Sequence, residues 1–190
     1  METIKPQASD KVLDIGAGEG HETALNFFEE WYPYRKNITA LGITDLPNFR
    51  KKYPEITFVI GDGRKLPFAN NSFDIYFSNA VLEHVGSFQQ QKQFIEEACR
   101  VAPKIFISTP NRLFPIDVHT LIPFAHYFPQ TVRGKIYRFF GKDYFATEDR
   151  LRLTYKNEIQ KMLPAGVKME TYPQKILGMT INLNLVITRK

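Results

Sequence analysis

Residues 11–21 read Lys11-Val12-Leu13-Asp14-Ile15-Gly16-Ala17-Gly18-Glu19-Gly20-His21. The apolar run ends with an acidic residue, three glycines follow at alternate positions, and helical spacing begins near residue 22. This order predicts a strand, a tight turn and a helix. Glycines let the backbone turn sharply and leave out the Cβ atoms that would keep a ligand away from it. We therefore expect a small polar ligand on this turn.

The spacing of the glycines indicates which kind of ligand to expect. A dinucleotide-binding turn has the pattern G-x-G-x-x-G and would need its third glycine at position 21, which is His21. The carboxylate of Asp14, at the end of the predicted strand, would repel a diphosphate and attract an ammonium group. The pattern favours a cationic ligand and argues against a nicotinamide-dependent oxidoreductase.

Residues 14–20 resemble the first motif of the class I methyltransferases that depend on S-adenosylmethionine (SAM). Residues 61–68, 71–75 and 82–85 resemble later motifs of the branch typified by quinone-biosynthesis methyltransferases, which carries a methyltransferase type 11 domain. The resemblance covers roughly residues 10–110. It implies a Rossmann-like α/β fold, with a mostly parallel seven-stranded sheet, an antiparallel last strand and helices on both faces. It also implies SAM as cofactor and S-adenosylhomocysteine (SAH) as product.

The resemblance assigns cofactor contacts residue by residue. Asp45 would accept hydrogen bonds from the ribose, although it stands one place later than the acid of the family, and a turn or helix-cap aspartate is the alternative. Asp62 would accept from the adenine amine. His21 would pack beside the methionine part. The full predicted set is Asp14, Ile15, Gly16, Ala17, Gly18, Gly20, His21, Asp45, Asp62, Gly63, Arg64, Asn79 and Ala80.

The residues from 72 to 79 predict a strand, and residues 79–85 form the segment at its end. The substrate should enter beside this segment. His84 is the candidate general base because its side chain titrates near neutral pH; a role in orienting the loop is the alternative. Asn111, Arg112 and His119 are candidate substrate contacts. We expect a small-molecule acceptor, with lipid-linked and saccharide-linked acceptors both open. A SAM-binding sensor or subunit without catalytic activity is the second hypothesis.

Residues 113–150 form an irregular insertion in what we expect to be a single domain spanning residues 1–190. Prolines interrupt an aromatic run there, and a stretch mixing aromatic and basic residues follows. Insertions of this length are usually functional, so we expect a lid over the substrate. The same composition would also suit a segment that packs its own small core, or peripheral contact with an anionic membrane surface.

Composition and charge indicate which partners, metals and cellular location to expect for this protein. Residues 1–100 carry 11 basic and 14 acidic side chains, whereas residues 101–190 carry 14 basic and 6 acidic ones. The second half is therefore basic, but no motif supports a nucleic-acid partner, and we expect none. The single cysteine excludes an internal disulfide, and no cluster has the spacing of metal ligands, so we expect no metal. The sequence shows no signal peptide, which predicts a cytoplasmic location, and it leaves the oligomeric state open.

Overall fold

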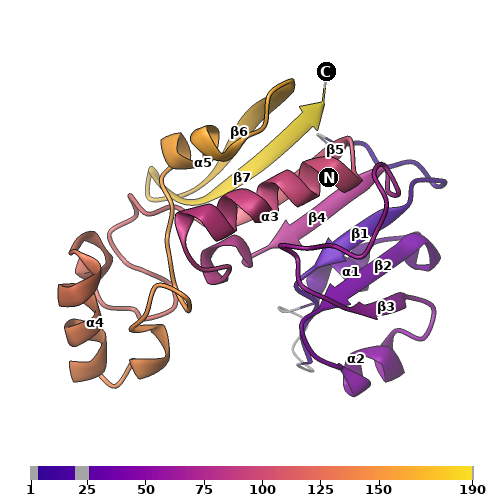
Figure 1. The fold of residues 1–190 in the computed structure, drawn as a ribbon. Helices are drawn as coiled ribbons and strands as arrows, with labels where there is room; N and C mark the ends of the chain where they lie inside the picture. Colours follow the sequence, from indigo (N-terminus) through magenta and orange to yellow (C-terminus); the bar gives the residue numbers. More distant parts are fainter. Residues whose placement is uncertain (1–3, 20–25, 190) are drawn as a thin grey trace.

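The computed structural model describes residues 4–19 and 26–189. These residues form a seven-stranded sheet with the order β3-β2-β1-β4-β5-β7-β6 (Figure 1). Neighbouring strands from β3 to β5 are parallel, and β7 is antiparallel to both β5 and β6. This topology confirms the predicted fold class. The strands are β1 (Val12–Ile15), β2 (Ile38–Gly42), β3 (Thr57–Ile60), β4 (Ile75–Asn79), β5 (Lys104–Pro110), β6 (Val167–Ile176) and β7 (Met179–Arg189).

Helices cover both faces of the sheet and give it two apolar layers. Phe94 and Ile159 belong to the layer on one face, whereas Phe28 and Phe49 belong to the other. The helix over residues 88–101 begins with a capping box, in which Ser87 and Gln90 exchange side-chain and backbone hydrogen bonds. The helices are α1 (Phe27–Trp31), α2 (Pro47–Lys52), α3 (Phe88–Val101), α4 (Gln130–Phe139) and α5 (Lys156–Met162), with 3-10 turns η1 (Arg35–Asn37), η2 (Leu82–His84), η3 (Ala125–Tyr127) and η4 (Asp143–Phe145).

The order of the strands determines where a ligand can lie. The chain goes outward from β1 to β2 and β3, then returns to place β4 on the other side of β1. The carboxyl ends of these four parallel strands therefore meet at one edge of the sheet. Open α/β sheets bind ligands at such a reversal of strand order, in the crevice beyond the carboxyl ends.

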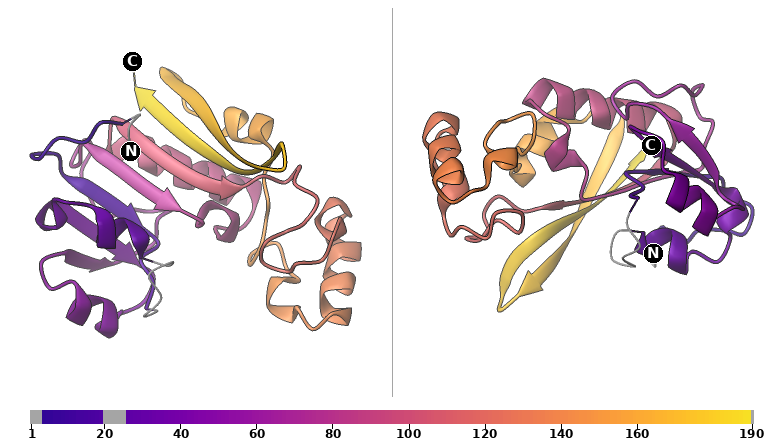
Figure 2. Two further views of the ribbon diagram at one scale, coloured as in Figure 1. Left: turned by 180° about the vertical axis from the view of Figure 1, so that it is seen from behind. Right: turned by 90° about the horizontal axis from the view of Figure 1, so that it is seen from below.

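The insertion between β5 and α5 packs its own small core. η3, α4 and η4 belong to this segment, and α4 lies well apart from the sheet in every view (Figures 1 and 2). At the base of the insertion, Asn111 pairs with Thr154 in a β-bridge, so that its two ends lie side by side. The buried residues of its core are Ala125, Tyr137, Ala146, Leu151 and Leu153. In the described part of the chain, no helix is long and apolar enough to cross a bilayer.

Candidate functional site

A cavity of about 570 Å³ lies at the carboxyl ends of β1, β2 and β3. Its size is within the range of about 300–1,000 Å³ that is typical of small-molecule sites. The turns after β1 and β3 and the segment around η2 form its walls, and the end of the insertion borders it. The lining residues that the sequence predicted are Ile15, Gly16, Ala17, Asp62, Gly63, Arg64 and His84.

Two glycines let the walls of this cavity approach each other. Gly16 has a φ of 103°, and a Cβ atom at this position would lie 2.2 Å from Cγ2 of Val81. A Cβ atom at Gly63 would lie 2.6 Å from Cε2 of Phe94. Real Cβ atoms cannot pack at such distances, so both positions need glycine. The two glycines therefore let the turn after β1 pack against Val81 and the turn after β3 pack against Phe94, two side chains that also line the cavity.

The glycine turn is closed from the helix side by Asn26. Its Oδ1 accepts a hydrogen bond of 3.0 Å from the amide of Gly18, and its Nδ2 donates one of 2.9 Å to the carbonyl of Gly18. Asn26 is buried at the start of α1. Gly20 and His21, the other predicted contacts in this turn, lie outside the described residues.

Asp14 does not line the cavity. Side chains alternate between the two faces of a strand, and Leu13 and Ile15 pack toward α3, so Asp14 lies on the α1 side. There it is 4% exposed, beside Glu29, which is 2% exposed. Burial, followed by repulsion from the Glu29 carboxylate, holds the pKa of Asp14 well above its usual range. The expected attraction between this carboxylate and a cationic ligand has no support in this arrangement.

The raised pKa of Asp14 predicts a pH dependence of stability. A group whose pKa is higher in the folded than in the unfolded state stabilises the fold below the unfolded pKa, and this contribution is lost as the pH rises through the folded pKa. Asp14→Asn cannot ionise, so its melting temperature should rise relative to that of the parent protein as the pH increases above about 4, the ordinary pKa of an aspartate in an unfolded chain. Thermal unfolding at several pH values measures this difference. The exposed control Asp143→Asn should show no such trend; a constant difference for Asp14→Asn would contradict the prediction.

Asp62 and Asp45 both form ion pairs with arginines. Nη2 of Arg64 lies 2.6 Å from Oδ2 of Asp62, and this pairing lowers the pKa of the Asp62 carboxyl. Asp62 and Arg64 line the cavity together. Asp45 pairs with Arg50 at 3.2 Å on the surface and does not line the cavity. This position agrees with the one-residue offset from the family's acid noted in the sequence.

The remaining predicted contacts lie outside the cavity lining. Asn79 borders a separate small hollow near Asp14, and Ala80 takes a left-handed φ of 54° and donates its amide to the carbonyl of Ser108. The side chain of Asn111 donates to the carbonyl of Thr180, at the base of the insertion. Arg112 stacks its guanidinium 4.9 Å from the ring centre of Tyr155.

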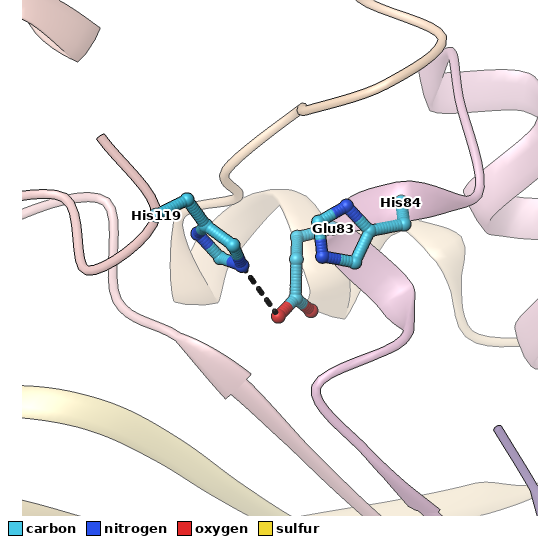
Figure 3. A group of neighbouring side chains, drawn as sticks. All are labelled: Glu83, His84 and His119. Carbon is cyan, nitrogen blue, oxygen red and sulfur yellow. Dashed lines mark ion pairs between the residues drawn. The ribbon is translucent and has the colours of Figure 1, made fainter. Parts of the chain in front are cut away.

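His84 lines the cavity and is exposed, and the structure brings His119 next to it. The two imidazole rings lie 4.8 Å apart, nearly perpendicular to each other. The buried carboxylate of Glu83 lies beside this pair, with its Oε1 3.8 Å from Nε2 of His119 (Figure 3). Burial raises the pKa of Glu83, against the opposing effect of the two histidines. Burial lowers the pKa of His119, but Asp117 and Glu83 outweigh it and raise that pKa overall.

Sequence reasoning missed the residues that the insertion contributes to the cavity. Thr147, Asp149 and Arg150 line it from a segment about 65 residues away from His84 in the chain. Nothing in their local sequence distinguishes them from other polar loop residues. Val81 and Val85, which lie in the predicted substrate-entry segment of residues 79–85, also line the cavity, as do Gln90 and Phe94 just after it.

Comparison with known proteins agrees with this geometry. A family model described as a methyltransferase domain matches residues 13–104. The chain is 29% identical over 124 residues to norajmaline N-methyltransferase of Rauvolfia serpentina, covering 59% of this chain and 40% of that protein. It is also 29% identical over 115 residues to the ubiquinone/menaquinone biosynthesis C-methyltransferase UbiE of Roseobacter denitrificans, covering 53% of this chain and 41% of that protein. The chain thus spans about two fifths of the length of these relatives.

Solved structures share the fold over nearly the whole chain. The magnesium protoporphyrin IX methyltransferase of Synechocystis, crystallised with bound SAH, matches with a TM-score of 0.59 and 17% identity, covering 95% of this chain and 74% of that one. At this identity the likeness concerns the fold alone. The matched domain and the curated relatives confirm the resemblance of this chain to the class I SAM-dependent methyltransferases, and the solved structures share its fold.

Proposed function

We propose that this chain transfers a methyl group from SAM to a small-molecule acceptor. The observation that carries the proposal is the cavity between the turns after β1 and β3, where Gly16 and Gly63 leave no room for a Cβ atom. When bound, SAM supplies a sulfonium methyl group: the acceptor bonds to this carbon, the carbon–sulfur bond breaks, and its electron pair stays on sulfur, giving SAH. The residues present fit this cofactor, because the cavity is of a size for a small molecule and is lined by glycine backbone and by the polar side chains of Asp62 and Arg64.

The protein's own contribution is to position the two reactants and exclude water. Asp62, paired with Arg64, and the two glycine turns would bind the nucleoside end. Thr147 and Arg150 approach from the insertion and narrow the cavity from the other side. Holding two reactants in line can lower the activation barrier by about 7–11 kcal/mol. Methyl transfer therefore needs little catalytic assistance other than positioning.

His84 is the residue that we propose for proton removal. Its Nδ1 lies 2.7 Å from the carbonyl oxygen of Arg150. A carbonyl oxygen only accepts hydrogen bonds, so Nδ1 carries the hydrogen and the neutral ring keeps a lone pair on Nε2. That lone pair can accept the proton of an acceptor hydroxyl or amine, which would add about 10²- to 10⁴-fold to the rate. An acceptor that is already ionised needs no such help.

Of lipid and saccharide carriers for the acceptor, the surface of the insertion favours a lipid. Lys135, Arg138 and Phe139 are exposed on α4 at spacings of three and four residues, which puts them on one helix face. Phe139 is 84% exposed and Phe140 follows it at 58%. A helix face that combines basic and aromatic side chains suits the interface of an anionic bilayer.

Binding and turnover together test this function. Calorimetric titration of the purified chain with SAH should give one site with micromolar affinity. SAH formation is then followed by mass spectrometry with a panel of acceptors, each offered free and embedded in anionic vesicles. We expect turnover with an acceptor presented on vesicles, and less at high salt because screening weakens the attraction between opposite charges. Failure to bind SAH would overturn the proposed function.

A SAM sensor without catalytic activity is the second candidate, and the position of Asp45 favours it. The acid expected to bind the ribose is paired with Arg50 outside the cavity lining. A sensor would bind SAM and SAH with similar strength and form no SAH with any acceptor. Formation of SAH with any one acceptor, at a rate above the spontaneous rate, would show that the chain is an enzyme and would exclude the sensor.

A further inference from the structure

Glu83, His84 and His119 form a cluster where η2 meets the insertion. One ligand atom from each side chain lies within 4.8 Å of the other two (Figure 3). His119 is 35 residues away from His84 in the chain, so no short sequence motif indicates that these side chains form a cluster. Phe145 packs near both histidine rings, with its ring centre 5.5 Å from that of His119, and forms an apolar wall beside them.

The carboxylate at the centre of this cluster has one oxygen left over. Glu83 is fully buried, and its Oε2 accepts a hydrogen bond of 3.0 Å from the hydroxyl of Thr109. Its Oε1 has no hydrogen-bond partner among the described residues. Burying a carboxylate costs free energy unless each of its oxygens has a hydrogen-bond donor or a positive charge beside it. Oε1 of Glu83 therefore needs a proton or a cation. It faces the two imidazole rings (Figure 3).

Both histidine rings have a polar partner at Nδ1, which leaves Nε2 of each ring available to bind a ligand. Nδ1 of His84 donates to the carbonyl of Arg150, and Nδ1 of His119 lies 2.9 Å from Oδ1 of Asp117. The Asp117 carboxylate also accepts from the hydroxyl of Thr120. In the neutral rings, both Nε2 lone pairs are then free and lie beside the Glu83 carboxylate. Metal-binding histidines are typically oriented in this way, by a carbonyl or carboxylate on the other ring nitrogen.

We propose that Glu83, His84 and His119 bind a divalent transition-metal ion such as Zn²⁺ through Oε1 and the two Nε2 atoms. Two imidazoles and one carboxylate suit Zn²⁺ and its first-row neighbours better than Mg²⁺ or Ca²⁺, which prefer sets made of oxygen alone. Ligands at about 2.1 Å from a tetrahedral ion are about 3.4 Å apart. The 3.8 Å between Nε2 of His119 and Oε1 of Glu83 is close to this value.

Three protein ligands would leave coordination positions open for water or an acceptor oxygen. Because His84 lines the cavity, the ion would lie at its border. A role for the ion in methyl transfer rests on the proposed function, whereas the binding of the ion does not. While Nε2 of His84 binds a metal it cannot accept a proton, so the general-base role proposed above belongs to the metal-free protein.

The test uses the full chain, stripped with a chelator and titrated with Zn²⁺ against a competing colorimetric chelator. We expect one equivalent bound and a melting temperature that rises with Zn²⁺, since an ion that binds only the folded state stabilises it. Affinity should fall at least about tenfold in Glu83→Gln and in His84→Ala, the range seen when ligands or their supports are removed. His84 is exposed, so His84→Ala should fold even if Glu83→Gln does not.

The matched control is Glu96→Gln, which removes the same charge from the exposed side of α3, where Glu96 pairs with Lys92. It should bind Zn²⁺ as the parent protein does. The proposal is overturned if the parent protein binds no ion, or if its ion is held equally well by His84→Ala and Glu83→Gln, which would mean binding elsewhere. An inactive but metal-binding protein would instead count against the proposed function alone.

Discussion

Gly16→Val should abolish binding of SAH while the protein still folds. Valine brings a Cβ atom to within 2.2 Å of Cγ2 of Val81, in a backbone conformation with a φ of 103° that side-chain-bearing residues rarely adopt. Such strain costs about 1–3 kcal/mol, and the turn can relieve it by moving into the cavity. The loss of affinity should be at least about hundredfold, or about 2.7 kcal/mol, in a calorimetric titration with SAH.

Gly166→Val is the control for the strain by itself. Gly166 also has a positive φ, of 80°, but a Cβ atom there meets nothing within 4 Å. It lies between α5 and β6 and does not line the cavity. Its variant should lose stability through backbone strain and keep its affinity for SAH. Normal affinity in a folded Gly16→Val protein would refute the placement of the nucleoside against this turn.

Gln91→Leu should destabilise the protein by about 3–5 kcal/mol, the range for breaking a buried network that holds a charge. Gln91 is fully buried on α3 and makes four hydrogen bonds. Its Nε2 donates to the carbonyls of Leu82 and Arg152, each at 2.9 Å. Its Oε1 accepts from Nη1 of Arg152 at 2.7 Å and from the hydroxyl of Thr154 at 3.1 Å. Leucine fills the same space but leaves these groups without that partner.

Urea and thermal unfolding measure this loss, which corresponds to a fall of about 10 °C in melting temperature for a domain of this size. Gln93→Leu makes the same substitution at an exposed position of the same helix and should change stability by less than about 0.5 kcal/mol. If the two variants were equally stable, Gln91 would not be what ties the insertion to η2. If the prediction holds, Gln91→Leu should also weaken SAH binding. Gln91 holds Arg152 in place, and the residues just before Arg152 in the chain line the cavity, namely Thr147, Asp149 and Arg150.

The sheet was predictable because its signals are local. Each parallel strand is an apolar run that ends at glycine or a polar residue, and the capping box of Ser87 and Gln90 marks the start of α3. The local pattern of residues 167–171 predicts a strand that ends before Pro173, whereas β6 continues through Pro173 to Ile176. Because β6 is an edge strand, a proline that donates no hydrogen bond is tolerated there.

The site was predictable only where residues close in sequence build it. The glycine turn and the end of β3 border the cavity as expected, since they are short local segments at the carboxyl ends of β1 and β3, the two strands that flank β2. Strand alternation puts Asp14 on the opposite face, and the offset of Asp45 places it in a surface ion pair. The meeting of Glu83 with His119 depends on how a long insertion folds back, and no periodicity encodes that.

The bridge between Asn111 and Thr154 has a consequence for how this protein can diverge in evolution. A segment whose two ends meet can be lengthened, shortened or replaced without changing the register of the strands that flank it. The strands that surround the glycine turn precede this segment in the chain, and the segment contacts the donor half through Arg150, Arg152 and Thr154. Recombination at residues 111 and 154 would therefore replace the insertion as a unit, provided that the new segment keeps these contacts.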